Sequence, residues 1–186
     1  MANVYRNQFA RGWRGAFGRS FVVHKTGSGK TIVAGKPLFI DNLTYTERQT
    51  MHQAAVRDAA IYASFAENQE AYIRRAKELH TTAYALAVAD WYRAPKVLEI
   101  NVDRWAGNAD EIIRVKARDN VMVASVMLVI RDAEGQILEM GEARQSKAGS
   151  VWWNYKTQSP IPLTPFPSIQ ATAYDLPGNR DSFTIS

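Results

Sequence analysis

The stretch that decides the fold reads V-M-V-A-S-V-M-L-V-I-R-D and runs from Val121 to Asp132. Because strand residues point alternately to two faces, one face of this stretch consists of Ala124, Val126, Leu128 and Ile130. The opposite face is also apolar and consists of Val123, Met127 and Val129. A strand that is apolar on both faces is normally covered on both faces. The sequence therefore predicts a strand inside a layered β-structure.

Shorter strands are predicted on both sides of this one. Alternation over 113–118 indicates a strand before the turn residues Asp119 and Asn120. D-A-E-G-Q at 132–136 is typical of a hairpin turn into a strand at 137–143. V-W-W-N-Y and the apolar residues of 169–173 indicate further strands, whereas four prolines between 159 and 167 require a loop or an edge. Short strands at regular turn spacing predict a β-sandwich over residues 95–186.

Two runs within this region resemble a known family. A-R-D-N-V-M-V-A-S-V-M-L-V-I-R-D-A-E-G and A-T-A-Y-D-L-P-G-N are similar to bacterial immunoglobulin-like domains. The matching positions are Asp119, Asn120, Val123, Val126, Asp132, Gly135, Ala171, Ala173, Asp175, Gly178 and Asn179. The resemblance covers about residues 96–186 and implies an immunoglobulin-like fold, which serves in spacers, adhesion modules and assembly units. The preceding residues are vaguely similar to uncharacterised bacterial proteins that end in such a domain, and this assigns no activity.

Residues 42–94 have the periodicity of helices. Thr44 and Glu47 have capping-box spacing before a helix expected to reach about Phe65. Its apolar positions are Met51, Ala55, Ala59 and Tyr62.

Two shorter helices are predicted to follow. One begins after Asn68, and the other begins after Thr81 or Thr82 and ends before Pro95. Three such helices form a small bundle, which we expect to lean on the hairpin or the later sheet for stability.

The first forty residues form a basic arm that is rich in aromatic residues. Their positive side chains are Arg6, Arg11, Arg14, Arg19, Lys25, Lys30 and Lys36, and none is acidic. The net charge of the chain is +5, so the net charge of the remaining residues is 5 − 7 = −2. Every fourth position from 5 to 21 is aromatic: Tyr5, Phe9, Trp13, Phe17 and Phe21. Each ring can bury roughly 150 to 250 Å², so the arm is expected to dock on the protein's own core, on another subunit, or on nucleic acid by stacking.

The arm continues into G-S-G-K-T at 27–31, which invites comparison with a phosphate-binding loop. That motif needs a glycine where His24 stands, and it needs a following helix, whereas I-V-A-G-K-P follows. Two β-branched runs around a glycine-rich tip predict a β-hairpin instead. The expected organisation is thus α+β, with the arm and hairpin at 1–41, about three helices at 42–94, and an immunoglobulin-like β-sandwich at 95–186.

Composition excludes several classes of protein. The chain has 186 residues, of which 46% are hydrophobic and 22% are charged, and this composition is typical of a globular protein. It has no cysteine, which excludes disulfides and metal sites built from thiolates. The first residues lack the apolar run of a cleavable signal peptide, and no stretch approaches the roughly 20 apolar residues of a membrane span. The expected location is therefore the cytoplasm, or the outside after release or export by a non-classical route.

The sequence offers no catalytic, metal or cofactor set that we would assign. The three histidines (His24, His52 and His80) fall in different elements, and no serine stands in a nucleophile elbow. The carboxylate pairs Asp110 with Glu111 and Glu139 with Glu142 are interpreted as turn and exposed-strand residues. One pole of the sandwich could bind calcium through Asp119, Asn120, Asp175, Asn179 and Asp181, although turn formation explains the same residues.

Trp152 and Trp153 are adjacent on a strand, so only one ring can enter the core and the other must be covered by something else.

We predict a non-enzymatic structural or interaction protein that forms a homo-oligomer, as a filament or a particle, through its arm. The predicted interface residues are Tyr5, Phe9, Arg11, Trp13, Arg14, Phe17, Arg19, Phe21, Val123, Met127, Val129, Trp152 and Trp153. The alternatives are nucleic-acid binding by the arm, and an adhesive or carbohydrate-binding module.

Overall fold

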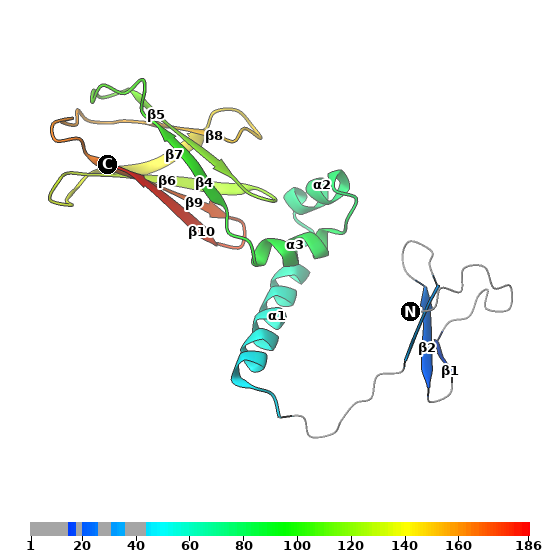
Figure 1. The fold of residues 1–186 in the computed structure, drawn as a ribbon. Helices are drawn as coiled ribbons and strands as arrows, with labels where there is room; N and C mark the ends of the chain where they lie inside the picture. Colours follow the sequence, from blue (N-terminus) through cyan, green and yellow to red (C-terminus); the bar gives the residue numbers. More distant parts are fainter. Residues whose placement is uncertain (1–14, 18–19, 26–30, 36–43) are drawn as a thin grey trace. The chain divides into compact units, whose positions relative to one another are not determined.

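The chain is α+β, as the sequence predicts, and forms two compact units that comprise residues 1–46 and 47–186 (Figure 1). The computed structural model describes residues 15–17, 20–25, 31–35 and 44–186.

The first unit contains a three-stranded antiparallel sheet in the order β1-β2-β3. Its strands are β1 (Gly15–Phe17), β2 (Phe21–Lys25) and β3 (Thr31–Gly35), and Val23 at the centre of β2 is buried. The predicted hairpin is confirmed by the pairing of β2 with β3. A strand follows G-S-G-K where a phosphate-binding loop would require a helix. The additional strand β1 was not predicted.

The second unit begins with three helices, in agreement with the sequence: α1 (Glu47–Ala66), α2 (Glu70–Glu78) and α3 (Ala83–Trp91). Only the second half of α1 packs closely, through Ala59, Ala63 and Ala66. The apolar face predicted for this helix is wrong at Met51, whose side chain is 67% exposed. The helix also begins at Glu47, later than its predicted capping box indicates.

The small helical core includes Tyr72 and Ala76 of α2 and Leu86 and Ala87 of α3. Thr82 is the N-cap of α3, because its Oγ1 accepts a hydrogen bond from the backbone N–H of Ala85 at 3.1 Å. Val121 and Leu176, from two turns of the sheet, pack against this core. The helices therefore pack against turns of the later sheet, as the small size of the helical region predicts.

The second sheet has seven antiparallel strands in the order β10-β9-β6-β7-β8-β5-β4. The strands are β4 (Lys96–Asn101), β5 (Ile112–Arg118), β6 (Val123–Arg131), β7 (Ile137–Gln145), β8 (Trp152–Lys156), β9 (Ser168–Asp175) and β10 (Arg180–Ile185). The backbone N–H of Val97 on β4 donates to Oδ2 of Asp181 on β10 at 2.9 Å. The sheet thus curls until its two edge strands meet, and it is nearly barrel-shaped (Figure 1). Strands β4 and β10 were not predicted.

One apolar core fills the inside of this curved sheet. Its fully enclosed side chains include Ile113 and Val115 of β5, Leu128 and Ile130 of β6, and Ile169 of β9. Alternate residues of β5, β6 and β9 are buried, which is the period of two that the sequence shows.

The start of β6 departs from simple alternation. Val123 pairs with Asp175 but Ser125 pairs with Tyr174, so Ala124 is the extra residue of a β-bulge. The bulge changes which face each residue occupies: Ala124 is exposed, although predicted to be buried, and Val123 packs against the core, although predicted on the opposite face. Met127 and Val129 are only half-buried, so the two-sided cover predicted for this strand is incomplete.

Candidate functional site

A buried polar network lies where the three helices meet the turns of the seven-stranded sheet. The hydroxyls of Tyr62 on α1 and Tyr72 on α2 are 2.7 Å apart. Tyr72 also donates to Oδ2 of Asp90 on α3 at 2.6 Å. Tyr72 and Asp90 are both fully buried, and Tyr62 is half-buried. This chain of hydrogen bonds therefore ties α1, α2 and α3 together largely away from bulk solvent, where hydrogen bonds are stronger.

Burial raises the pKa of Asp90 to about 7. The hydrogen bond from Tyr72 and the amide of Asn120 lower this pKa, whereas the charges of Asp119 and Asp175 raise it further. Burial also raises the pKa of Tyr72, and its hydrogen bond to Asp90 adds to the rise. The network therefore holds a carboxyl group that exchanges its proton near neutral pH while the tyrosine stays protonated.

The turn between β9 and β10 is bonded to both the sheet and α3. The side chain of Asn179 donates to Oδ2 of Asp175 at 2.9 Å and to the carbonyl oxygens of Asp90 and Trp91, each at 3.3 Å. The backbone N–H of Asn179 donates to Oδ1 of Asp175 at 2.6 Å. Burial raises the pKa of Asp175, and these hydrogen bonds oppose the rise.

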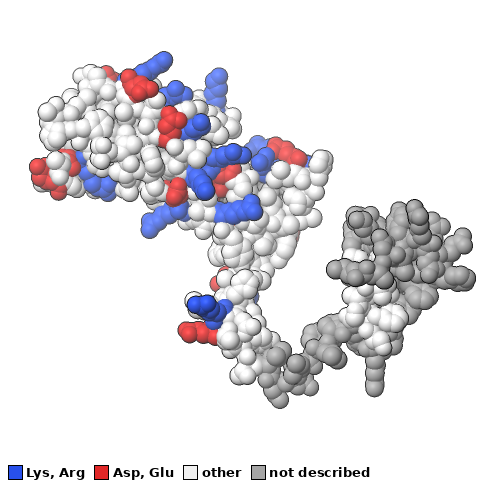
Figure 2. All heavy atoms as spheres, in the orientation of Figure 1, with Lys and Arg blue, Asp and Glu red and all other residues white. Residues whose placement is uncertain are grey.

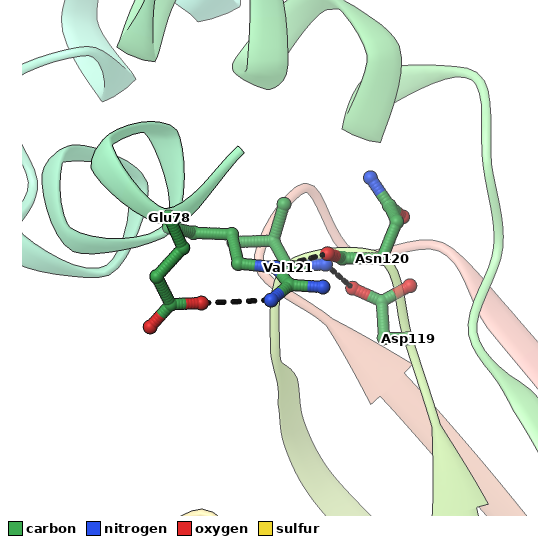
Figure 3. Close-up of polar contacts among 5 residues, drawn as sticks. Glu78, Asp119, Asn120 and Val121 are labelled. Carbon is green, nitrogen blue, oxygen red and sulfur yellow. Dashed lines mark hydrogen bonds and ion pairs between the residues drawn. The ribbon is translucent and has the colours of Figure 1, made fainter. Parts of the chain in front are cut away.

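The turn between β5 and β6 is bonded to α2 through Arg75 (Figure 3). Oδ2 of Asp119 accepts from the backbone N–H groups of Val121 and Met122, each at 3.0 Å. Arg75 of α2 donates from Nε to the carbonyl oxygen of Asn120 at 3.1 Å and pairs with Glu78 at 2.7 Å. Buried oxygens without a hydrogen-bond partner remain on Asp90, Asp119 and Asn120.

The residues predicted as a calcium alternative thus do lie at this pole. Their oxygens mostly bind backbone N–H groups of the turns, which is the second interpretation that the sequence leaves open. Within the described part of the chain, no three His, Cys, Asp or Glu residues are placed to hold a metal ion.

A basic pocket of about 780 Å³ opens beside this network. Its lining residues are Arg75, Leu79, Arg93, Ala94, Pro95, Lys96, Leu98, Arg118, Asp119, Asn120 and Asp181. Figure 2 shows Lys and Arg side chains gathered on the second unit where the helices meet the sheet. The sequence does not reveal this pocket, because its cations come from α2, from the connection between α3 and β4, from the start of β4 and from the end of β5.

The two adjacent tryptophans separate as predicted. Trp153 is buried in the core, and Trp152 is half-buried on the other face. Arg114 and Lys116 of β5 lie over the Trp152 ring, at 4.4 and 5.4 Å from its centroid. Two cations of the neighbouring strand therefore cover this ring by cation–π contact, a cover that the sequence did not suggest.

Glu139 is a buried carboxylate, which contradicts its interpretation as an exposed strand residue. It accepts hydrogen bonds from the Tyr155 hydroxyl at 2.8 Å, from the Gln158 N–H at 2.9 Å, and from the N–H and hydroxyl of Ser159 at 3.1 and 2.8 Å. Burial would raise its pKa, but these bonds together outweigh burial and lower the pKa. Glu139, which lies on β7, thus holds the proline-rich loop that follows β8. Strand β7 lies between β6 and β8 and is not an edge strand.

The remaining predicted interface residues belong to the first unit. Tyr5, Phe9, Arg11, Trp13, Arg14 and Arg19 lie outside the described residues. The backbone of Phe17 belongs to β1, and the side chain of Phe21 on β2 is 37% exposed.

No protein-family model and no curated protein matches the chain. Two solved structures are similar to parts of it. The crystal structure of CopC from Methylosinus trichosporium OB3b has 9% identity and a TM-score of 0.35, and the match covers 48% of this chain and 87% of that one. The crystal structure of an engineered protein has 19% identity and a TM-score of 0.37, and the match covers 55% of this chain and 25% of that one. These scores are too low to transfer a function.

In the described part of the chain, no helix is both long enough and apolar enough to cross a membrane.

Proposed function

We propose that this chain is a non-enzymatic structural protein that assembles with copies of itself. The observation on which the proposal rests is the uncovered apolar surface of α1. Met51, Val56, Ile61 and Phe65 of this helix are 67%, 47%, 52% and 77% exposed. Single exposed apolar residues are common, but the three that share a face of this helix, Met51, Ile61 and Phe65, form a surface of the kind that binds another protein.

The first part of α1 has little support from its own unit. No residue of 47–58 is buried. An isolated helix shorter than about 12 to 15 residues is only marginally stable in water, and most helical stability in proteins comes from packing. Contact with another subunit would supply the missing packing.

Three of the four exposed apolar residues of α1 share one face of the helix. With 3.6 residues in a turn, each residue advances by about 100°, so Met51, Ile61 and Phe65 fall within an arc of about 80°, and Val56 lies on another side. Ala63, which is fully buried in the unit, also lies on a different side. An apolar stripe along one face is expected of a helix that packs against a partner with that face.

We further propose that the seven-stranded part is an immunoglobulin-like sandwich, the fold that serves in assembly units. A three-stranded layer, β4-β5-β8, and a four-stranded layer, β7-β6-β9-β10, supply side chains to one core. Among the described residues, strand pairing between the two layers is limited to Arg144 with Asn154 and Gln145 with Trp153. At the other side the layers meet through the hydrogen bond from Val97 to Asp181. This division of seven antiparallel strands into three and four supports the proposal.

The first unit supplies a second means of assembly in this proposal. Strands β1 and β3 are the edges of its three-stranded sheet, and a strand edge can accept a strand from another chain. The aromatic residues of the arm would anchor that contact.

The experiment is a sedimentation measurement on the full chain. The double variant Met51→Gln with Phe65→Gln removes two exposed apolar side chains of α1, and Val151→Gln, at a site 40% exposed outside this helix, is the matched control. The natural chain and the control should associate, and the double variant should associate at least tenfold more weakly. Removal of residues 1–20 should also give a monomer. A double variant that associates like the control would overturn the role of α1.

A further inference from the structure

We infer that the basic pocket beside α2 is the docking site for the β6–β7 hairpin of a second copy of this chain. The inference rests on the proposed self-assembly and names a specific contact within it. It follows from the charges of the pocket, from its apolar lining, and from the matching composition of the hairpin.

The pocket has an excess of positive charge. Four cationic and two acidic side chains line it, which gives 4 − 2 = +2. Arg75 is engaged by Glu78 and Asn120. Within the described residues, the side chains of Arg93, Lys96 and Arg118 have no hydrogen bond or ion pair, and all three are exposed.

Each carboxylate of the pocket accepts hydrogen bonds from backbone groups through one oxygen, and Oδ1 of Asp119 is buried without a partner. Oδ2 of Asp119 accepts from the N–H groups of the β5–β6 turn, and Oδ2 of Asp181 accepts from Val97. Neither is positioned as an ion-pair partner for the three free cations. A negatively charged segment from another molecule would fill that role.

The lining is also apolar. Leu79 and Leu98 are 48% and 50% exposed, and Pro95 lies between the elements that carry them. A ligand that matches this surface needs aliphatic side chains as well as carboxylates. An acidic and aliphatic peptide segment has both.

The β6–β7 hairpin of this chain is such a segment. It reads D-A-E-G-Q-I-L from Asp132 to Leu138, and residues 133–138 are all exposed. Oδ1 of Asp132 accepts from the backbone N–H of Gln136 at 2.7 Å, which holds the turn. The carboxylate of Glu134 has no hydrogen bond or ion pair among the described residues, and Ile137 and Leu138 are 54% and 40% exposed.

The pocket and the hairpin lie at opposite ends of the same unit. Strand β6 begins at Val123 beside the helices and ends at Arg131 beside the hairpin. Figure 1 shows the β6–β7 turn at the end of the sheet away from α2 and α3. A copy therefore cannot satisfy its own pocket, and the contact joins different surfaces of two copies. Contacts of this head-to-tail type produce rings or open filaments.

The first test uses a peptide, so its result does not depend on whether the chain self-associates. A fluorescent cyclic peptide with the sequence of residues 130–140 is titrated with the full chain, and its anisotropy is recorded. Binding should weaken at least tenfold in Arg118→Glu. It should be unchanged in Lys147→Glu, an exposed basic residue outside the pocket. Binding should also weaken with salt, because the charges involved are exposed.

The second test exchanges the charges within the full chain. Arg118→Glu and Glu134→Arg should each reduce the sedimenting mass, and the double variant should restore it, because the two charges are reversed together. A peptide that does not bind, with single variants that associate like the natural chain, would refute the docking and leave self-assembly through α1 or the arm intact. A natural chain that stays monomeric and does not bind the peptide would refute both.

Discussion

Replacement of Glu139 by glutamine should strongly destabilise the second unit. The carboxylate accepts four hydrogen bonds, from Tyr155, Gln158 and two groups of Ser159, and it is 8% exposed. Glutamine retains one oxygen for Tyr155 and Gln158, but its amide group then faces the Ser159 N–H. A buried donor without an acceptor costs about 1–3 kcal/mol, and the remaining bonds lose their charge assistance, so the expected total is about 2–4 kcal/mol.

The assay is thermal unfolding followed by circular dichroism at pH 7. One kcal/mol shifts the melting temperature of a domain of this size by about 2–4 °C, so Glu139→Gln should lower it by about 5–15 °C. Glu142→Gln is the matched control, because Glu142 is exposed on the same strand. Exposed substitutions usually stay within about 0.5 kcal/mol.

The effect should also depend on pH with a definite sign. The pKa of Glu139 is lower in the folded protein than its ordinary value of about 4.3. The ionised carboxylate therefore stabilises the fold above that value, and the stabilisation is lost as the pH falls through the folded pKa. The difference between Glu139→Gln and the natural chain should shrink below about pH 4. Equal melting temperatures at pH 7 would refute the assigned role of these hydrogen bonds.

Three further predictions concern stability. The pKa of Asp90 is about 7 in the folded protein, well above its unfolded value, so the free energy of unfolding should fall as the pH rises from 5 to 8. Asp90→Asn should flatten this pH dependence in urea unfolding, and an unchanged slope would count against the raised pKa of Asp90. Trp153→Ala should lower the free energy of unfolding by about 3–5 kcal/mol, because it leaves a cavity in the core. Trp152→Ala should lower it by only about 1 kcal/mol, through the lost cation–π contacts. Equal losses would contradict the assignment of the two rings to opposite faces. Gly107→Ala should unfold more readily than Gly135→Ala in the same assay, since both have φ of 84° but only at Gly107 would a Cβ lie 2.5 Å from the Ile161 oxygen.

The sequence predicted the helices and most strands because their periods are clear. Alternation predicted β5 and most of β6. The start of α3 was predicted after Thr81 or Thr82, and the structure has Thr82 as its N-cap. Simple alternation failed at Ala124, since a bulge adds one residue to a strand without any change in the local pattern.

Long-range contacts were beyond the reach of sequence patterns. Glu139 resembles any charged residue of an exposed strand, and its four donors come from residues 16 to 20 positions away. Asp90 was not singled out because its partners come from α2 and from two turns of the sheet. The cations of the basic pocket gather for the same reason, through the meeting of separate elements.

The exposure of α1 was also unpredictable from its pattern. Met51 and Ala55 have helical spacing with Ala59, which predicts one buried face along the whole helix. The unit buries residues only in the second half of the helix, and no residue of 47–58 is buried. Where a helix meets its neighbours depends on the tertiary arrangement, and spacing alone does not specify it.

Sedimentation of the full chain over a wide range of concentrations tests the proposed self-assembly most directly. One chain has a mass of 20.9 kDa. Self-assembly should give species of several times this mass, and their share should grow with concentration. A single species of one-chain mass at every concentration would contradict it.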